Sequence, residues 1–419
     1  MDNEKIFFGE EKVNYLILIA GLFFIIMLGY RNQFVSFGVP LVISGYFMAK
    51  NLLILKDLKI LLPLVLLFIL GFRIGAGHPL IHILRDYAYF LSPMTAFTMG
   101  YILKKYMSLN KFMLLIVLFG TLYSLVYLLQ IVFDFDTLFV ADAEDTRYTI
   151  GTGLPAPILA FVFIFLGKEY LKKFDISTLY WFLFSLVNLL SIYYFASRVY
   201  YFTLFLYFIP LLYNKFISKY RRVGIYIFGV ILVVIGGAII LILSGDNFFA
   251  EKMRNSLTEM FIQSFNDYED VIHNWRAYEL YEAVKTFMNG GILDKLFGFG
   301  FGKTVYLEYE LIMPLLTMSE IPIFHNGFAY LLIKTGLVGI FLELYFTISL
   351  LYKGYMYSKD KDELKFVFCI LLSTVLSFNF SALVVNGLFS GESCVLLILT
   401  GFTYSLLKEK YKESYFEKN

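Results

Sequence analysis

Long apolar runs separated by short polar segments dominate this chain. A membrane-spanning helix needs about 20 mostly apolar residues, with about 17 as a lower limit. The runs predict twelve transmembrane helices, of which the third and the last are short. Their predicted bounds are Val13–Tyr30, Phe34–Leu55, Leu58–Phe72, Leu80–Leu103, Phe112–Phe133, Leu154–Leu171, Ser177–Phe195, Val199–Ile217, Val223–Leu243, Gly327–Tyr352, Phe366–Val385 and Glu392–Leu407.

One long polar stretch, Gly245–Phe324, interrupts this pattern between the ninth and tenth predicted spans, and His325-Asn326-Gly327 follows it. Apolar residues at helical spacing predict two helices within it. One stripe contains Phe249, Met253, Leu257, Met260 and Phe261, and the other contains Val271, Trp275, Tyr278, Tyr281, Val284 and Met288. We expect a helical insertion.

A glycine-rich run, Gly298-Phe299-Gly300-Phe301-Gly302, lies near the end of the insertion. It does not match a nucleotide-binding loop, because no strand is predicted before it and only three residues separate Gly298 from Gly302-Lys303-Thr304, where such a loop needs four. We interpret it as a flexible turn.

The pattern therefore predicts an all-α integral membrane protein in four parts. Residues 1–244 hold spans one to nine, 245–324 form the insertion, 325–407 hold spans ten to twelve, and 408–419 form a tail.

The distribution of basic residues predicts how the spans are oriented in the membrane. With the N-terminus inside, lysines gather in the inner segments, and the outer short loops hold only Arg31, Arg73, Arg147 and Arg198. Cytoplasmic loops carry an excess of Lys and Arg. We therefore expect a multi-pass membrane protein with both termini cytoplasmic and the insertion extracytoplasmic.

Composition agrees with this class. The chain is 59% hydrophobic and its mean hydropathy is +0.72, whereas soluble proteins contain about 45–50% apolar residues. The net charge of +2 gives no indication of a nucleic-acid partner. Cys369 and Cys394 lie in apolar runs without metal-ligand spacing, and the acidic start predicts no cleavable signal peptide.

Arginine is concentrated on the outer side, unlike lysine. Arginine presents a planar fork that suits phosphate and stays charged when partly buried. This bias predicts a phosphate-bearing ligand at the outer face. The alternative is that each arginine pairs with a nearby acid, such as Asp86, Asp142, Glu144 or Asp145.

Several outer residues are candidates for chemistry. Asp134-Phe135-Asp136 could bind a divalent cation, but it is more typical of a solvated loop, and we predict no metal site and no cofactor. Arg147 leads into Gly151–Pro157, where the start of a helix would attract anions.

Two further arginines and a histidine complete the set. Arg198 sits in a tight turn at the membrane boundary, where it faces either a wet cavity or lipid headgroups. Arg276 could form a surface pair with Glu279. His325 lies where the chain re-enters the membrane, and a neutral imidazole there could accept a proton.

These residues resemble, in order, the motifs of the O-antigen ligase and Wzy-type polymerase superfamily of bacterial membrane glycosyltransferases. The resemblance covers residues 147–345 and is most specific in the run HNGFAYLLIKTGLVG, which begins at His325. It also includes Arg147 with Gly153-Leu154-Pro155, Ser197-Arg198, and Trp275-Arg276 followed by the glycine run. Pro155-Ala156-Pro157 departs from the expected Pro-Asn pair.

The resemblance implies a GT-C-like fold and inverting, metal-independent transfer from an undecaprenyl-pyrophosphate-linked oligosaccharide. Arg198 and Arg276, with Arg147, would bind the pyrophosphate, and His325 would deprotonate the acceptor hydroxyl. A polymerase would use a lipid-linked repeat unit as acceptor, whereas an O-antigen ligase would use lipid A-core. We expect the polymerase, working with a flippase and a chain-length regulator.

A transporter or flippase for lipid-linked oligosaccharide is the alternative from another class, and a non-catalytic scaffold is a third. Twelve spans suit a transporter, but the sequence shows no internal repeat and few charges within the spans.

Overall fold

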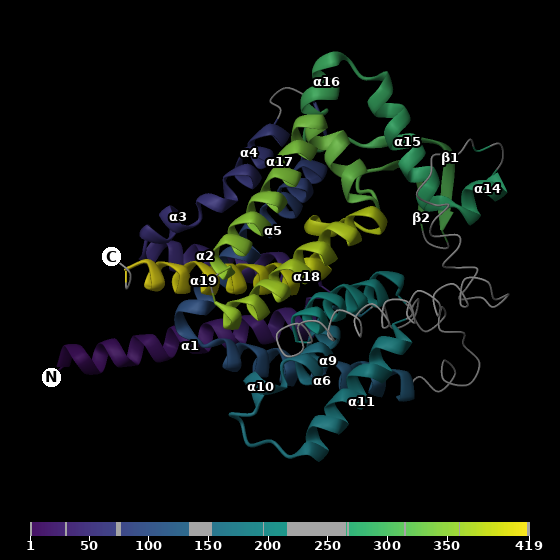
Figure 1. The fold of residues 1–419 in the computed structure, drawn as a ribbon. Helices are drawn as coiled ribbons and strands as arrows, with labels where there is room; N and C mark the ends of the chain where they lie inside the picture. The colour runs from purple at the N-terminus through teal and green to yellow at the C-terminus, as the bar shows by residue number, and fades with distance from the viewer. Residues whose placement is uncertain are drawn as a thin grey trace.

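A computed structural model describes residues 2–29, 32–72, 77–133, 153–195, 197–215, 265, 268–313, 316–359 and 361–416 (Figure 1). Four helices in these ranges are long and apolar enough to cross a membrane. They are residues 11–28 of α1 (Asp2–Leu28), α6 (Leu109–Phe133), α17 (Gly327–Ser358) and α18 (Asp362–Val384). The mostly helical fold with helices able to cross a membrane is thus confirmed, while the topology, the count of twelve spans and the GT-C arrangement remain predictions.

The other helices are mostly apolar and pack around these. Their bounds are α2 (Gln33–Lys50), α3 (Leu53–Asp57), η1 (Lys59–Leu61), α4 (Leu62–Gly71), α5 (Leu80–Tyr106), α9 (Ala156–Leu166), α10 (Lys168–Leu171), α11 (Thr178–Tyr194), η2 (Gly387–Phe389), η3 (Gly391–Ser393) and α19 (Cys394–Phe416). A further helix covers residues 198–215.

Helices α5 and α19 are in close contact. A Cβ on Gly100 would lie 1.9 Å from the Ile398 carbonyl oxygen, and one on Gly401 would lie 2.0 Å from the Phe97 carbonyl oxygen. Small residues let helix backbones approach closely within a membrane, where van der Waals packing drives association. The two glycines therefore fix α5 at the centre, with its residues 89–103 largely buried.

The insertion contains α14 (Tyr268–His273), α15 (Trp275–Asn289), α16 (Ile292–Phe297) and an antiparallel hairpin of β1 (Val305–Met313) and β2 (Leu316–Ile321). Figure 1 shows α14, α15 and the hairpin together at the end of the molecule away from the two termini. The prediction of a wholly helical insertion is wrong at the hairpin. Val305 and Leu307 are buried and Tyr306 is exposed, which is the alternation of a half-buried strand.

The two predicted helices of the insertion have different outcomes. The first stripe, Phe249–Phe261, lies outside the described residues. The second is divided between α14 and α15 at Asn274. Tyr278 is buried as predicted, but Met288 is exposed and Glu279 and Glu282 are buried.

Helix α17 is broken at Gly336, where φ is +66°. The glycine run fills this break. The backbone N–H groups of Phe299 and Gly300 donate to the carbonyl oxygens of Ile333 and Lys334, at 2.8 and 3.1 Å. These bonds satisfy carbonyl groups that lose their helical partners at the break.

The rest of the run is fixed as well. Phe301 N–H donates to the Gly71 carbonyl at the end of α4 (2.7 Å), and Gly302 N–H donates to Asp86 Oδ2 in α5 (2.7 Å). Gly298, Gly300 and Gly302 all have positive φ, which side chains rarely tolerate. The run is a docked segment and not the flexible turn that we expected.

Candidate functional site

His325 lies in a rigidly held stretch between β2 and α17. Asn326 caps α17, because its side-chain oxygen accepts from the Ala329 N–H at 2.9 Å. Its amide nitrogen donates to the Leu383 carbonyl near the end of α18 at 3.1 Å. Gly327 packs against the backbone of Asn386. The start of α17 is thus attached to the connection between α18 and α19.

Glu279 of α15 holds the imidazole of His325. Its Oε2 lies 2.9 Å from His325 Nδ1 and 3.2 Å from the His325 backbone nitrogen. The Glu279 side chain is 2% exposed, whereas that of His325 is 42% exposed. The Trp275 ring meets the imidazole edge to face, with centroids 5.5 Å apart. One carboxylate and one indole therefore fix the position of the ring.

This contact assigns the tautomer. An ionised carboxylate only accepts hydrogen bonds, so Nδ1 carries the proton that it receives. Nε2 then keeps its lone pair, and the His325 side chain as a whole is 42% exposed. A neutral imidazole oriented through Nδ1 can accept a proton at Nε2.

The sequence did not identify Glu279 as part of this site. We expected a surface partner for Arg276, but Glu279 is buried. A signal was present, because Glu279 follows Trp275 by one helical turn and residues so spaced share a face. Both contact His325, so this face of α15 lies against the start of α17.

The other buried acid of α15 is Glu282. Burial raises the pKa of its carboxyl above the usual range, and the neighbouring Lys285 opposes this effect. Lys285 lies 3.5 Å from Glu282 and 2.7 Å from Glu308 of β1. The ion pair with Glu308 attaches the hairpin to α15.

The predicted arginines fall in three places. Arg276 is half-buried in the first turn of α15, the same end that supplies Trp275 and Glu279 to His325. Arg198 is half-buried at the start of helix 198–215. Arg147 lies outside the described residues. The structure thus brings Arg276 and His325 to the same junction.

Arg198 belongs to a neighbouring part of the same region. The buried Tyr200 hydroxyl lies 2.8 Å from both the Gly153 carbonyl and Glu392 Oε2. Glu392 is part of η3, in the same α18–α19 connection whose Asn386 contacts Gly327. This connection therefore separates the start of helix 198–215 from the start of α17.

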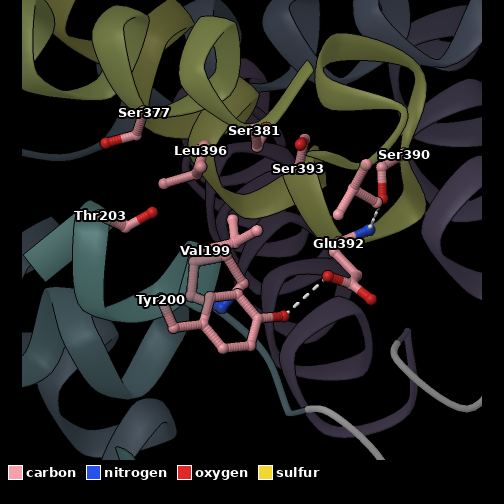
Figure 2. Close-up of a pocket in the computed structure, with 11 residues that line it drawn as sticks. Val199, Tyr200, Thr203, Ser377, Ser381, Ser390, Glu392, Ser393 and Leu396 are labelled. Atoms are coloured by element: carbon pink, nitrogen blue, oxygen red, sulfur yellow. Dashed lines mark hydrogen bonds between the residues drawn. The ribbon is translucent and has the colours of Figure 1, made fainter. Parts of the chain in front are cut away.

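A small pocket lies at this connection (Figure 2). Hydroxyl groups from helix 198–215, α18 and η3 face it together with Glu392, whose backbone N–H donates to Ser390 Oγ at 3.2 Å. The lining residues are Pro155, Val199, Tyr200, Thr203, Ser377, Ser381, Val385, Ser390, Glu392, Ser393 and Leu396.

A second acid–base cluster lies along α17. Asp86 and Lys334 are both fully buried, with Oδ2 and Nζ 2.6 Å apart. Asp86 Oδ1 accepts from the Tyr330 hydroxyl at 2.6 Å, and Lys334 also donates to the Lys303 carbonyl. Together with the Gly302 N–H, these groups surround Asp86 and join α5, α17 and the glycine run.

Metal-binding geometry does not occur among the described residues, where no group of three or more His, Cys, Asp or Glu side chains converges. Asp134 and Asp136 lie outside them. Cys369 and Cys394 are buried free thiols.

Comparison with models of known protein families finds no match, and comparison with curated proteins finds none either. The function is therefore argued from the site itself.

Proposed function

We propose that the protein is a bacterial polysaccharide polymerase of the Wzy type. It would transfer an undecaprenyl-pyrophosphate-linked glycan to a lipid-linked repeat unit at the outer face of the membrane. The observation that carries this proposal is the Glu279–His325 pair, which presents an oriented imidazole at the junction between the insertion and the bundle.

The proposed reaction uses His325 as general base. Nε2 takes the proton of an acceptor hydroxyl, whose oxygen forms a bond to the anomeric carbon of the donor glycan. The bond between that carbon and the pyrophosphate oxygen breaks with inversion, and undecaprenyl pyrophosphate leaves with the electron pair. Glu279 stabilises the imidazolium that forms, as a carboxylate on the second ring nitrogen does in other acid–base sites.

Arginines have a separate role in this proposal. Negative charge accumulates on the leaving pyrophosphate, and fixed cations aimed at that charge lower the barrier. Arg276 shares the end of α15 with the groups that hold His325. Arg198 and Arg147 would complete the binding of the donor, with the bilayer holding both polyprenyl chains.

Chain growth is the decisive experiment. Purified protein in nanodiscs, supplied with lipid-linked repeat units, should produce longer glycans and release undecaprenyl pyrophosphate, and it should do so in EDTA. Transfer only to lipid A-core would identify a ligase. Sugar translocation without chain growth would instead identify a flippase and contradict the proposal.

The arginine roles have their own test. Arg198→Lys and Arg276→Lys keep the charge but lose the bidentate fork. We expect a markedly higher KM for the donor in each, with unchanged folding. Wild-type kinetics in both variants would remove these residues from the donor site.

A further inference from the structure

Arg85 in the second turn of α5 has an unusual environment. Its Nε and Nη2 atoms are buried, and neither has a hydrogen-bond partner within the described part of the chain. These two N–H groups lie on the same edge of the guanidinium and point in parallel. This edge is the fork that binds two oxygens of a carboxylate or phosphate at once.

The adjacent acid does not explain the position of Arg85. Asp86 already accepts from Tyr330, Gly302 and Lys334, and its carboxylate is paired with the buried Lys334 ammonium. The sequence left open that Arg85 pairs with Asp86. In the structure, Asp86 neutralises Lys334, and Arg85 forms no salt bridge with any described residue.

His82 adds a second buried group without a hydrogen-bond partner on the same side of α5. It precedes Arg85 by three residues, so the two side chains are neighbours on the helix surface. Its Nδ1 is also buried without a partner among the described residues. His78, one turn before, is engaged differently, because its Nε2 donates to the Phe299 carbonyl at 3.3 Å.

Buried donors without partners are rare, and a buried charge without a counter-charge is rarer still. A cluster of such groups in one place is the pattern that a binding site shows when its ligand is absent. The chemistry selects an oxyanion, because the fork supplies two parallel donors and a full positive charge.

We infer that Arg85, assisted by His82, binds a phosphate group at the outer end of α5. The identity of the ligand rests on the proposed function. A polymerase uses two lipid-linked pyrophosphates, and Arg198, Arg276 and Arg147 are assigned to the donor. Arg85 lies beside Asp86, which contacts Tyr330 in the turn of α17 that follows His325. The phosphate is therefore that of the lipid-linked acceptor.

Thermal unfolding of purified protein in zwitterionic nanodiscs tests the phosphate site without any activity. Wild type should gain Tm with added inorganic pyrophosphate, and Arg85→Gln should gain less, because only the donor arginines then remain to bind it. Arg85→Lys should show a reduced gain, because it keeps the charge without the fork. The matched control Lys295→Gln removes a cation from α16 and should behave as wild type. An equal gain in wild type and Arg85→Gln would overturn the site.

The ligand-free protein gives a second readout. The Arg85 fork has no partner to lose among the residues that the structure describes, so Arg85→Gln should be at least as stable as wild type without ligand. A clear loss of Tm in the ligand-free variant would show that the guanidinium has a structural role, and would overturn the inference.

The source of the phosphate is decided by lipid composition. Undecaprenyl pyrophosphate in the nanodisc should raise Tm more in wild type than in Arg85→Gln, which keeps only the donor site. An equal Arg85-dependent gain from phosphatidylglycerol alone would identify a headgroup site and overturn the acceptor assignment.

Kinetics separate this inference from the proposed function. Arg85→Gln should raise the KM for the lipid-linked acceptor about tenfold and change the KM for the donor little. Polymerisation with an unchanged acceptor KM in this variant would contradict the Arg85 site but not the polymerase function. Absence of polymerisation in wild type, with an Arg85-dependent gain in Tm, would sink the proposed function and leave the phosphate site.

Discussion

Two acid–base pairs lie at the start and in the first half of α17, and they differ in solvent exposure. Asp86 and Lys334 are 0% exposed, and other donors occupy both carboxylate oxygens of Asp86. Glu279 is buried, but its partner His325 is 42% exposed. The first pair is fully buried within the protein, whereas the histidine of the second pair is partly exposed.

This difference assigns a structural role to the Asp86–Lys334 pair and a chemical role to the Glu279–His325 pair. A saturated, buried pair cannot exchange a proton with a ligand, and its removal leaves charges in a poorly solvating environment. A partly exposed pair can accept a proton while its carboxylate keeps the ring oriented. The Asp86–Lys334 pair fixes the segment of α17 that follows the Glu279–His325 pair. Mutation of the first pair should therefore lower mainly stability, and mutation of the second should lower mainly activity.

The largest expected effect is the loss of the partly exposed imidazole. His325→Ala should lower the rate of chain elongation by roughly 10²–10⁴-fold, the usual contribution of a general base. Its Tm should stay near that of wild type, because much of the side chain is exposed. Initial rates with lipid-linked repeat units measure this, and full activity in the variant would remove His325 from the mechanism.

The Asp86–Lys334 pair should show the opposite pattern. Asp86→Ala leaves Lys334 without its counter-charge and Tyr330 without its acceptor, and should cost about 3–5 kcal/mol of unfolding free energy. Lys334→Met should cost less, because the Asp86 carboxylate keeps its hydrogen bonds from Tyr330 and Gly302. Chemical unfolding in detergent gives both values. Equal losses in the two variants would argue against this account of the cluster.

Glu279 should affect turnover more than stability. Glu279→Gln keeps the shape but loses the carboxylate that orients Nδ1–H, and kcat should fall on the order of 10²-fold. KM should change little, since Glu279 is a positioning residue and does not contact substrate. Steady-state kinetics provide the measurement, and Glu279→Asp should recover part of kcat. A change confined to Tm would indicate a purely structural role.

The docked glycine run gives a smaller effect on stability. Gly298→Ala places a Cβ 2.4 Å from the Lys334 carbonyl carbon at a φ of +76°. Backbone strain of this kind costs about 1–3 kcal/mol. Gly45→Ala is the control, since a Cβ there meets open space within α2 and should not lower stability. Thermal unfolding compares the two, and equal Tm values would show that the run tolerates side chains.

The smallest effect concerns the pH dependence of stability. Burial raises the pKa of Glu282 in the folded protein, so its protonated form stabilises the fold and this contribution is lost as pH rises through that pKa. Glu282→Gln should therefore be slightly more stable than wild type at neutral pH and match it in acid. Tm measured across pH tests this, and a parallel offset at every pH would contradict it.

Hydropathy alone predicted the long spans closely. The predicted span Phe366–Val385 corresponds to α18 at Asp362–Val384, and Phe112–Phe133 to α6 at Leu109–Phe133. A continuous apolar run of this length has few stable alternatives to a helix in lipid. Such predictions depend only on local composition.

The site was less predictable because its contacts join distant residues. Glu279 and His325 are 46 positions apart, and Asp86 and Tyr330 are 244 apart. The type of His325 and its place before a span suggested chemistry, but no local pattern indicated which acid orients it. The glycine run was misread because glycine permits both mobility and close docking, and only the neighbouring α17 distinguishes them.

The docking of the glycine run bears on how such an insertion can change during evolution. Its backbone completes the hydrogen bonding of α17 and occupies a carboxylate of α5. A chimera that exchanges residues 245–324 alone would therefore join mismatched halves of one hydrogen-bonded unit. The insertion, the first half of α17 and the outer turns of α5 should be inherited and exchanged as a single block, so substrate specificity would diverge by point substitution within that block more readily than by loop replacement.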